Sequence, residues 1–599
     1  MEGQRVLLDR IEQVCRKAVE NVFGISPTRV TLDFPDQFGD LALNAFHLAK
    51  DLRKAPPAIA QALAEELEKD ALIERATPVK GYVNLVLHRP ALAEGALSPA
   101  LRAGDSFGFR ERTDPSQRIM VEFSSPNTNK PQHLGHVRTN CLGDSVARLL
   151  EATGTDVIRA NLVNDRGIHI CKSMLAYQRE GQGMTPESVG KKGDHFVGDF
   201  YVLFETRFRE EWKRYRDEHP EQSEISRDEF AKISEWMAGA RDVLRRWEEG
   251  DEEVLALWKL MNGWVMEGFE ETYRTLGIRF DRIYLESETY QLGKEIVSEG
   301  LRKGVFHRRD DGAVEIDLSD VKLDRKVVLR SDGTSVYITQ DIGTTVMKTE
   351  EYGLDGQIFV VGNEQIYHFN VLFEILKRLG YEWAANCRHL AYGMVNLPEG
   401  KMKSREGTVV DADNLIEEVS RLAHKEILSR QPDVDEKAAE ERALNIALAA
   451  LKFMILSVSP KTTMLYDPKA SVSFEGDTGP YVLYAFARIQ RMLEDSGLGP
   501  DDVEFDPAVL TDESEIRLML KLVEFPRVVE KAAADLNPSL ISSWLLACAR
   551  AYHSHNRAVP ILKADDPAVR KARLMLSRAT ATALSQGLKL LGIKTVDRM

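Results

Sequence analysis

The segment from Arg118 to Leu150, RIMVEFSSPNTNKPQHLGHVRTNCLGDSVARLL, constrains the fold more than any other part of the chain. An apolar, β-branched run predicts a buried strand over 119–123, and a turn rich in Ser, Asn and Pro follows it. Apolar residues return at helical spacing near Leu134. A strand, a turn and a helix in this order place the unpaired N–H groups of the first helical turn where an anion can bind.

Charged and flexible residues surround this turn. Lys130, His133 and His136 stand at the predicted start of the helix, and Gly135 lets a flat ligand approach the backbone closely. Taken alone, a His-x-Gly-His tetrapeptide is equally typical of solvated surface histidines or of metal ligands. The rest of the sequence is needed to choose between these two interpretations of the histidines.

Composition predicts several domains and no membrane span. A chain of 599 residues with 43% apolar content is too long for one core, so we expect three or more domains. No segment approaches ~20 uninterrupted apolar residues, and the N-terminus lacks the apolar core of a signal peptide, which favours a cytoplasmic protein. The five cysteines have no paired spacing, so they predict small buried hydrophobic residues and no disulfide framework or zinc knuckle.

The distribution of charge matters more than its total. A net charge of -15 normally disfavours a nucleic-acid partner, because affinity for phosphate depends on Lys and Arg. Residues 541–599, however, carry ten Lys or Arg against three Asp. This basic terminal segment is suited to face RNA, although a helical domain with a solvated basic face fits it equally well.

The pattern of elements predicts a multidomain α/β protein. Alternating strands and helices over 114–410 indicate a doubly wound, Rossmann-like parallel sheet, interrupted by a charged helical insertion at about 173–290. A small α+β domain precedes it at 1–113, a helical connecting segment follows at 411–470, and an all-α bundle ends the chain at 471–599. Further strands are expected at 156–162, 281–285, 314–318 and 357–361, together with a strand that ends over Tyr337 to Gln340 before a helix near Asp341.

In open α/β sheets, ligands bind at the carboxyl ends of the strands. This rule places Tyr337, Asp341 and Gln365 in the same crevice as Glu122 and Asn127. Asp341 alone would more often be a helix N-cap. Further along the chain, the glycine-flanked loop EGKMKSREG predicts a mobile cationic segment suited to a triphosphate.

Together, the two motifs resemble the signatures of class I aminoacyl-tRNA synthetases, and EFSSPNTNKPQHLGH is similar to the first signature of the arginyl-tRNA synthetase family. The resemblance covers nearly the whole chain. FGDLALNAF and GYVNLVL resemble an N-terminal additional domain that contacts the outer corner of tRNA, and the terminal helices resemble an anticodon-binding bundle. The resemblance implies that ATP enters as a complex with Mg²⁺ and that L-arginine and an arginine-accepting tRNA are the other partners. We expect a monomer and no protein-bound zinc.

The second signature departs from the usual Lys-Met-Ser-Lys-Ser pattern. The chain has Lys401-Met402-Lys403-Ser404-Arg405, so Ser404 fills the place of the second lysine. Many arginyl enzymes share this departure and carry a lysine ahead of the first signature, where this chain has Lys130. The resemblance therefore gives Lys130 the compensating phosphate contact and Lys401 the pyrophosphate contact, and whether Lys130 or Lys403 replaces the missing lysine stays open.

The resemblance also implies a set of functional residues, which fall into four groups. They are catalytic Lys130, His133, His136 and Lys401; ATP-binding Gly135, His133, His136, Met394, Lys401, Lys403 and Ser404; arginine-binding Glu122, Ser124, Asn127, His133, Tyr337, Asp341 and Gln365; and tRNA-binding Tyr484, Arg488, His553 and Met599. A guanidinium is planar and always charged, so carboxylates and an aromatic face suit it. We therefore expect Asp341 and Tyr337 on the guanidinium side, with Asn127 and Gln365 on the α-amino and carboxylate side.

Two alternatives remain. A cysteinyl-type synthetase shares the terminal bundle but needs zinc in its amino-acid pocket, which the scattered cysteines do not provide. A non-catalytic tRNA-binding or regulatory relative is suggested by the altered second signature, and the intact HLGH motif argues against it.

Overall fold

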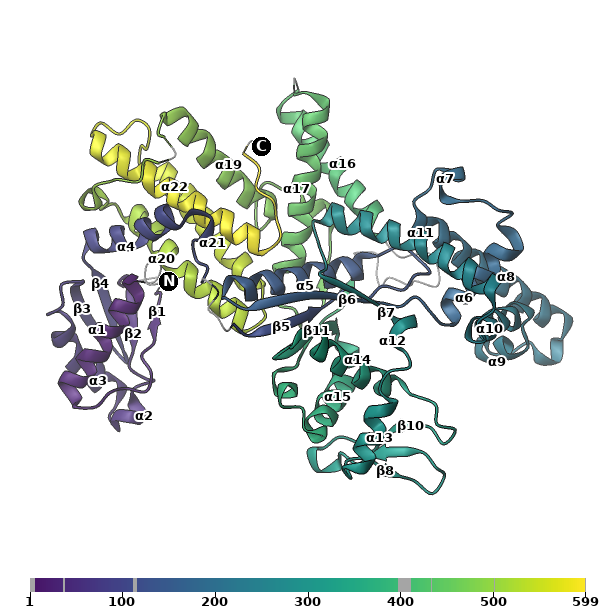
Figure 1. The fold of residues 1–599 in the computed structure, drawn as a ribbon. Helices are drawn as coiled ribbons and strands as arrows, with labels where there is room; N and C mark the ends of the chain where they lie inside the picture. The colour runs from purple at the N-terminus through teal and green to yellow at the C-terminus, as the bar shows by residue number, and fades with distance from the viewer. Residues whose placement is uncertain are drawn as a thin grey trace.

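The structure is a computed structural model that describes residues 6–35, 38–110, 112, 116–396, 411–432, 434–499 and 501–597. A small N-terminal domain and a helical C-terminal part lie to one side of a central parallel sheet, and a helical insertion extends on the other (Figure 1). Among the described helices, none is long and apolar enough to cross a membrane. The predicted domain boundaries at 113, 410 and 470 stay predictions.

The N-terminal domain is a four-stranded antiparallel sheet with helices, in the strand order β1-β2-β4-β3. In β4, buried and more exposed residues alternate, as expected for a sheet with one covered face. Its elements are α1 (Val6–Phe23), β1 (Leu32–Asp33), β2 (Leu41–Asn44), α2 (Ala49–Leu52), α3 (Pro56–Leu67), β3 (Ile73–Val79), β4 (Tyr82–Leu87), α4 (Arg89–Ala103) and the 3₁₀ turn η1 (Gly104–Ser106).

The central sheet has five parallel strands in the order β12-β11-β5-β6-β7. They are β5 (Arg118–Glu122), β6 (Asp156–Val163), β7 (Arg282–Leu285), β11 (Gly356–Gly362) and β12 (Arg388–Tyr392). The strand order reverses between β5 and β11, so the crevice for a ligand lies at the carboxyl ends of these two strands. The predicted doubly wound sheet is thereby confirmed.

Helices cover both faces of this sheet. The helix α5 (Leu134–Ala152) lies on one face, while α14 (Tyr337–Tyr352) and α15 (Ile366–Leu379) lie on the other (Figure 1). Under α14, the buried side chains of Met120, Ala160 and Leu354 form a small apolar cluster. Burial on both faces explains why the strands are continuous apolar runs in the sequence.

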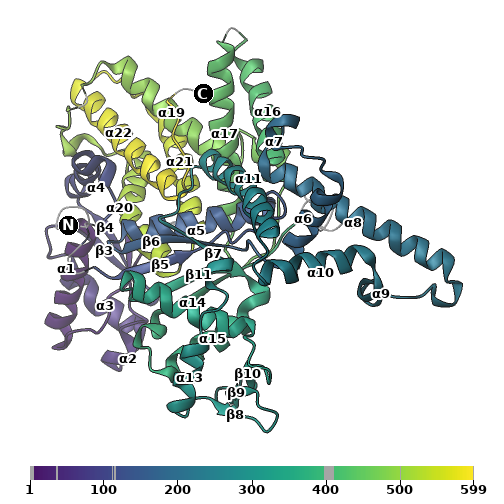
Figure 2. The ribbon, with the colours of Figure 1, turned by 45° about the vertical axis from the view of Figure 1, so that its right-hand side comes forward.

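The charged region after β6 is helical, as predicted. Its elements are α6 (Ile168–Glu180), α7 (Pro186–Val189), α8 (Gly193–Glu218), η2 (Pro220–Gln222), α9 (Arg227–Ile233), α10 (Glu235–Glu248) and α11 (Glu252–Leu276). Edge-to-face contacts among Tyr177, Phe200 and Trp264 give these helices an aromatic core. Figure 2 shows α8, α9 and α10 extending away from the sheet.

Two expectations for strands need correction. The strand predicted at 314–318 is present as β9 (Val314–Ile316), but it is the middle strand of a separate antiparallel sheet with β8 (His307–Arg308) and β10 (Lys326–Leu329), and it does not belong to the parallel sheet. Residues 337–340 were expected to end a strand, but they form the first turn of α14. The β-branched residues there face a buried core, and Thr339 donates a hydrogen bond to the backbone oxygen of Val328, so packing overrides strand propensity.

Short elements complete the catalytic half. They are α12 (Glu286–Thr289), α13 (Lys294–Arg302), η3 (Ser319–Val321), η4 (Asn363–Gln365), η5 (Glu382–Asn386) and β13 (Val395–Asn396), which pairs with β14 (Met464–Leu465).

The remainder of the chain is helical, as predicted. The predicted connecting segment contains α16 (Ala412–Arg430) and α17 (Glu436–Leu456), followed by α18 (Pro468–Ser471), and the predicted C-terminal bundle contains α19 (Gly479–Ser496), η7 (Pro507–Val509), α20 (Glu513–Ala534), α21 (Ser539–Ala558) and α22 (Pro567–Leu590). The N-terminal domain docks on this bundle through Phe107, whose ring stacks on Phe525 at a centroid distance of 5.6 Å. All five cysteines are buried and free, which confirms their predicted role as small hydrophobic residues.

Candidate active site

The turn after β5 is held in a strained conformation. Ser124 and Ser125 have φ angles of 80° and 48°, in the left-handed region that non-glycine residues rarely adopt. The Ser124 hydroxyl hydrogen-bonds Tyr273 at 2.7 Å, and the Ser125 N–H donates to the Asn161 side chain at 3.0 Å. These bonds fix the turn, which leaves the next polar residue, Asn127, exposed at the carboxyl end of the strand.

The two signature histidines cap α5 reciprocally. The Gly135 N–H donates to Nδ1 of His133 at 3.1 Å, and the His133 N–H donates to Nδ1 of His136 at 3.1 Å. A ring nitrogen that accepts a hydrogen bond carries no proton, so each neutral imidazole holds its proton on Nε2. Both rings can therefore donate one hydrogen bond through Nε2 to a ligand beyond the helix start.

Electrostatics keep both rings neutral. Burial and the nearby Lys130 lower the pKa of His133 to about 4, and burial, with smaller contributions from His133 and Lys130, holds the pKa of His136 well below its usual value. Burial also lowers the pKa of Lys130. Because the imidazoles are uncharged near neutral pH, they supply hydrogen bonds, and Lys130 supplies the positive charge among the described residues of this turn.

We expect the ring of His133 to stay unprotonated from pH 8 down to about 5.5. Its folded-state pKa of about 4 lies below the ordinary 6.5, so the stability it contributes is present above pH 6.5 and is lost as the pH falls toward 4. NMR of protein with ¹³C-labelled histidine, assigned with a His133→Gln variant, measures this titration directly. A midpoint between pH 6 and 7 for this ring would contradict the buried, neutral pair.

A pocket of about 200 Å³ opens beside these residues. It lies between the first signature and helix α8, and its lining includes Lys130, His133, His195, Tyr201 and Asp411. The segment that follows the predicted cationic loop is tied to the same place, because the Ala412 N–H donates to the backbone oxygen of Gln132 at 2.9 Å. The described chain therefore resumes, at Asp411, next to the helix start that carries the histidines.

Lys401, Lys403 and Ser404 of that loop lie outside the described residues, as does Met599. On the near side of the loop, Met394 is described and exposed, immediately before β13. Its proposed ATP contact stays a prediction.

A charged cluster joins the start of α16 to the start of α8. Lys192 Nζ lies 2.5 Å from Asp413 Oδ2, and His195 Nε2 lies 2.9 Å from the same oxygen. Hydrogen bonds from His195 and Lys192 lower the pKa of Asp413 to about 2 against the opposing effect of burial, and the bond to Asp413 raises the pKa of His195. The spacing of Asp194, His195 and Asp413 would suit a cation, but Lys192 already supplies positive charge to both carboxylates.

The predicted arginine pocket brings two carboxylates together. Asp341, on the second turn of α14, accepts a hydrogen bond from His368 Nε2 at 2.6 Å through one oxygen, Oδ2. Burial raises the pKa of Glu286, the first residue of α12; the nearby Arg166 opposes this shift, and the charge of Asp341 adds to it. Because α12 contacts α14, the two carboxylates form an acidic site suited to a cation. Glu286 was missed from the sequence, although a carboxylate directly after a predicted strand was a usable signal.

Tyr337 and Gln365, two other predicted arginine-binding residues, are exposed. The side chain of Tyr337 is 80% exposed at the start of α14, and Gln365 is exposed in the turn after β11. Both are free to meet a ligand, as their predicted roles require, and those roles stay predictions.

Unlike Tyr337 and Gln365, the predicted arginine-binding residues Glu122 and Ser124 are buried. Glu122, the last residue of β5, is buried and forms an ion pair with Lys348 of α14, which is itself 1% exposed. Ser124 is buried against Tyr273. Each side chain thus has a partner inside the protein, so both stabilise the crevice in the structure. A direct contact of either with arginine stays a prediction.

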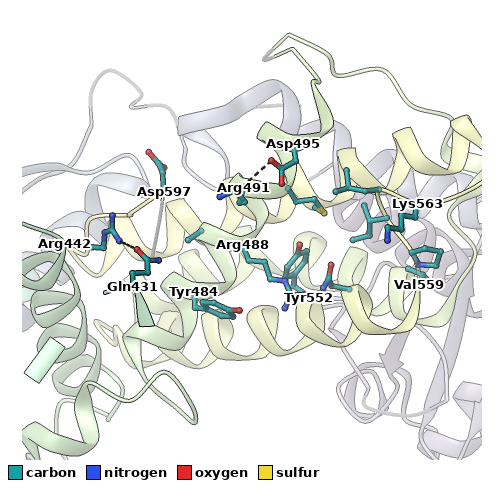
Figure 3. Close-up of a pocket in the computed structure, with 16 residues that line it drawn as sticks. Gln431, Arg442, Tyr484, Arg488, Arg491, Asp495, Tyr552, Val559, Lys563 and Asp597 are labelled. Carbon is teal, nitrogen blue, oxygen red and sulfur yellow. Dashed lines mark hydrogen bonds and ion pairs between the residues drawn. The ribbon is translucent and has the colours of Figure 1, made fainter. Parts of the chain in front are cut away.

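The predicted tRNA-binding residues of the bundle are brought together. Tyr484 and Arg488 line a pocket of about 720 Å³ between α19 and α21 (Figure 3). His553 lies beside it and stacks on Tyr484 at a centroid distance of 5.9 Å. Arg442, Arg491 and Lys563 add positive charge to the lining, with Asp495 and Asp597 as the acidic residues there. Aromatic rings next to cations suit single-stranded nucleic acid.

Comparison with known proteins first defines the class. The family described as tRNA synthetases class I (R), catalytic domain, matches residues 99–467. An arginyl tRNA synthetase N terminal domain matches 6–87, and a DALR anticodon binding domain matches 482–599. The doubly wound sheet and the histidine pair are thus those of a class I aminoacyl-tRNA synthetase.

Whole-chain relatives then define the family. An arginine–tRNA ligase of Treponema denticola is 42% identical over 100% of this chain and 99% of its own, and one of Porphyromonas gingivalis is 43% identical over 99% and 100%. The structure of Thermus thermophilus arginyl-tRNA synthetase matches with a TM-score of 0.81 and 28% identity, covering 99% of this chain and 100% of that one. The chain belongs to the arginyl-tRNA synthetase family.

Proposed function

We propose that this chain is an arginine–tRNA ligase. It activates L-arginine with ATP to arginyl-adenylate and pyrophosphate, and it then transfers arginine to the 3′ end of its tRNA. One observation supports the assignment of the substrate: Asp341 of α14, held by His368, and Glu286 of α12 are acidic side chains on two helices in contact with each other, an arrangement suited to a cationic amino acid.

Activation requires little covalent chemistry from the protein. An oxygen of the arginine carboxylate attacks the α-phosphorus of ATP, the bond from this phosphorus to the bridging oxygen breaks, and pyrophosphate leaves. Negative charge builds on the phosphates, so positioned donors and cations lower the barrier. The Nε2 protons of His133 and His136 and the charge of Lys130 supply these interactions, and ATP enters together with Mg²⁺.

Transfer requires the tRNA to reach this crevice from the bundle. The pocket around Tyr484 and Arg488 is proposed to hold the anticodon, because exposed aromatic rings stack on bases and arginines pair with phosphates. On the N-terminal domain, Phe38 and Phe46 are 77% and 53% exposed, and they are proposed to meet the outer corner of the tRNA. We place the activity in the cytoplasm and expect a monomer in solution.

Aminoacylation tests the proposal directly. With ATP, Mg²⁺ and an arginine-accepting tRNA transcript, we expect radiolabelled arginine to become attached to the tRNA, and arginine-dependent ATP–pyrophosphate exchange to occur in the presence of that tRNA. A folded protein that shows neither reaction would refute the proposal. Cysteine-dependent exchange would favour the cysteinyl-type alternative, and tRNA binding without either reaction would favour a non-catalytic relative.

A further inference from the structure

A second basic pocket lies where the C-terminal tail crosses helix α5. It has a volume of about 370 Å³ and is here called the junction pocket. Its lining comprises Arg148, Gly277, Ser585, Lys589, Gly592, Ile593, Lys594 and Thr595. Three of these residues are cationic, and none of the lining residues in the described part of the chain is acidic or aromatic.

The floor of the junction pocket is rigid. Asp144 accepts a hydrogen bond from Arg148 Nε at 2.7 Å, and Lys452, which is only 4% exposed, donates to the backbone oxygen of Gly592. Gly592 has a φ of +66°, and a Cβ there would lie 2.8 Å from Asp144 Oδ2, so a glycine is required for the tail to approach this closely. The Ser145 hydroxyl donates to the Leu590 oxygen at 2.8 Å and adds a further tie.

The two lysines at the rim are available for a ligand. Lys589 and Lys594 are both exposed, and neither has an acidic ion-pair partner among the described residues. Lys589 Nζ lies 5.6 Å from the ring centroid of Phe109, which orients it without neutralising its charge. Asp144, below the lysines, forms ion pairs with both Arg148 and Arg159, the latter at 3.7 Å. One carboxylate thus faces two guanidinium groups, so it does not neutralise the positive charge of the pocket.

The position of the junction pocket follows from its two neighbours. Thr595 lines it, and Asp597, about 7 Å further along an extended chain, lines the pocket around Tyr484. Arg148 lies on α5 about 18 Å from His136 at the rise of an α-helix. The junction pocket therefore adjoins the proposed anticodon pocket and shares a helix with the candidate active site.

We propose that the junction pocket binds a backbone phosphate of the tRNA, between the anticodon and the acceptor end. The inference rests on the proposed function, since it concerns the same RNA partner. A lining with three cations and no aromatic or acidic side chain suits a phosphate, whereas a base would need a stacking surface or polar groups that read its edge. A phosphate contact of this kind positions the tRNA without reading its sequence.

The test is a double variant, Lys589→Gln with Lys594→Gln, in the full-length protein. Its affinity for the tRNA transcript is expected to fall roughly tenfold at moderate salt, and the slope of log K against log salt concentration is expected to become shallower by about 0.7 to 0.9, the change for one phosphate that is no longer neutralised. Both lysines are exposed, so circular dichroism and the melting temperature should be unchanged.

Two single variants serve as comparisons. Lys377→Gln removes an exposed lysine on α15, on the opposite side of the sheet, and should leave the affinity and the salt slope unchanged. Tyr484→Ala removes a stacking ring, so it should lower the affinity with little change in the salt slope.

An unchanged affinity and salt slope in the double variant would overturn the proposal. A second result would also overturn it. If millimolar inorganic phosphate shifted the NMR signals of Lys589 and Lys594 while the double variant kept the wild-type affinity for tRNA, the pocket would be a small-anion site. A failure of the proposed function would look different. In that case the wild-type protein would not attach arginine to tRNA. If only the phosphate-site proposal fails, the wild-type protein attaches arginine to tRNA and the double variant binds tRNA as tightly as the wild type.

Discussion

Replacing Lys130 with alanine is expected to lower arginine-dependent ATP–pyrophosphate exchange about 100- to 1,000-fold, the usual effect of removing one preorganised donor to a developing charge. Lys130 lines the pocket beside the first signature, and burial lowers its pKa, so it acts in a site partly shielded from water. Its neighbours His133 and His136 are neutral and cannot replace its charge. Exchange kinetics with saturating tRNA, followed by titration of ATP and arginine, measure the effect.

Lys403→Ala is the matched comparison, because it removes the other lysine that could substitute for the missing second lysine of the loop. If Lys130 makes the compensating contact, Lys403→Ala should cost much less than Lys130→Ala, and Lys130→Arg should restore part of the rate by restoring the charge. A large loss from Lys403→Ala with a small loss from Lys130→Ala would assign the role to the loop. Unchanged tRNA affinity in both variants would show that the losses concern chemistry.

The fold was largely predictable because each main element has a strong local pattern. The apolar run before Ser124 and the helical spacing after Leu134 predicted β5 and α5, and the alternation of strands and helices predicted the doubly wound sheet. The prediction failed over residues 337–340, where β-branched residues start a helix. There the deciding interactions come from the packing of α14 on a small antiparallel sheet, which no local pattern reveals.

The sequence predicted which residues belong to the candidate site better than it predicted their contacts. The sequence placed the histidines at the helix start after a buried strand, as the structure has them, whereas Asp341 lies on the second turn of α14 and follows no strand of the central sheet. It could not show that Glu122 meets Lys348 or that Asp413 meets Lys192, because each pair joins residues more than two hundred positions apart. Such contacts depend on the complete fold, and they decide which predicted ligand-binding side chains are already occupied.

Replacing Asp341 with asparagine is expected to lower kcat/KM for arginine roughly 100- to 1,000-fold, mostly through a higher KM, while the KM for ATP changes little. A guanidinium that loses one partner of a charge-assisted pair commonly loses about 2 to 5 kcal/mol of binding free energy. Asparagine keeps the shape of the side chain and an acceptor oxygen for His368, so the loss reports the charge. Exchange assays across a range of arginine concentrations measure it.

Citrulline, which has a neutral urea in place of the guanidinium, separates charge recognition from a general defect. Wild-type protein should reject citrulline strongly, because it would leave the carboxylates of Asp341 and Glu286 without a cation. In Asp341→Asn the ratio of arginine to citrulline activity should narrow, and Glu286→Gln should narrow it too if both carboxylates face the substrate. His368→Gln, which keeps a donor to Asp341, should cost about tenfold or less. If Asp341→Asn slowed both amino acids equally and left their ratio unchanged, the carboxylate pair would not be the guanidinium site.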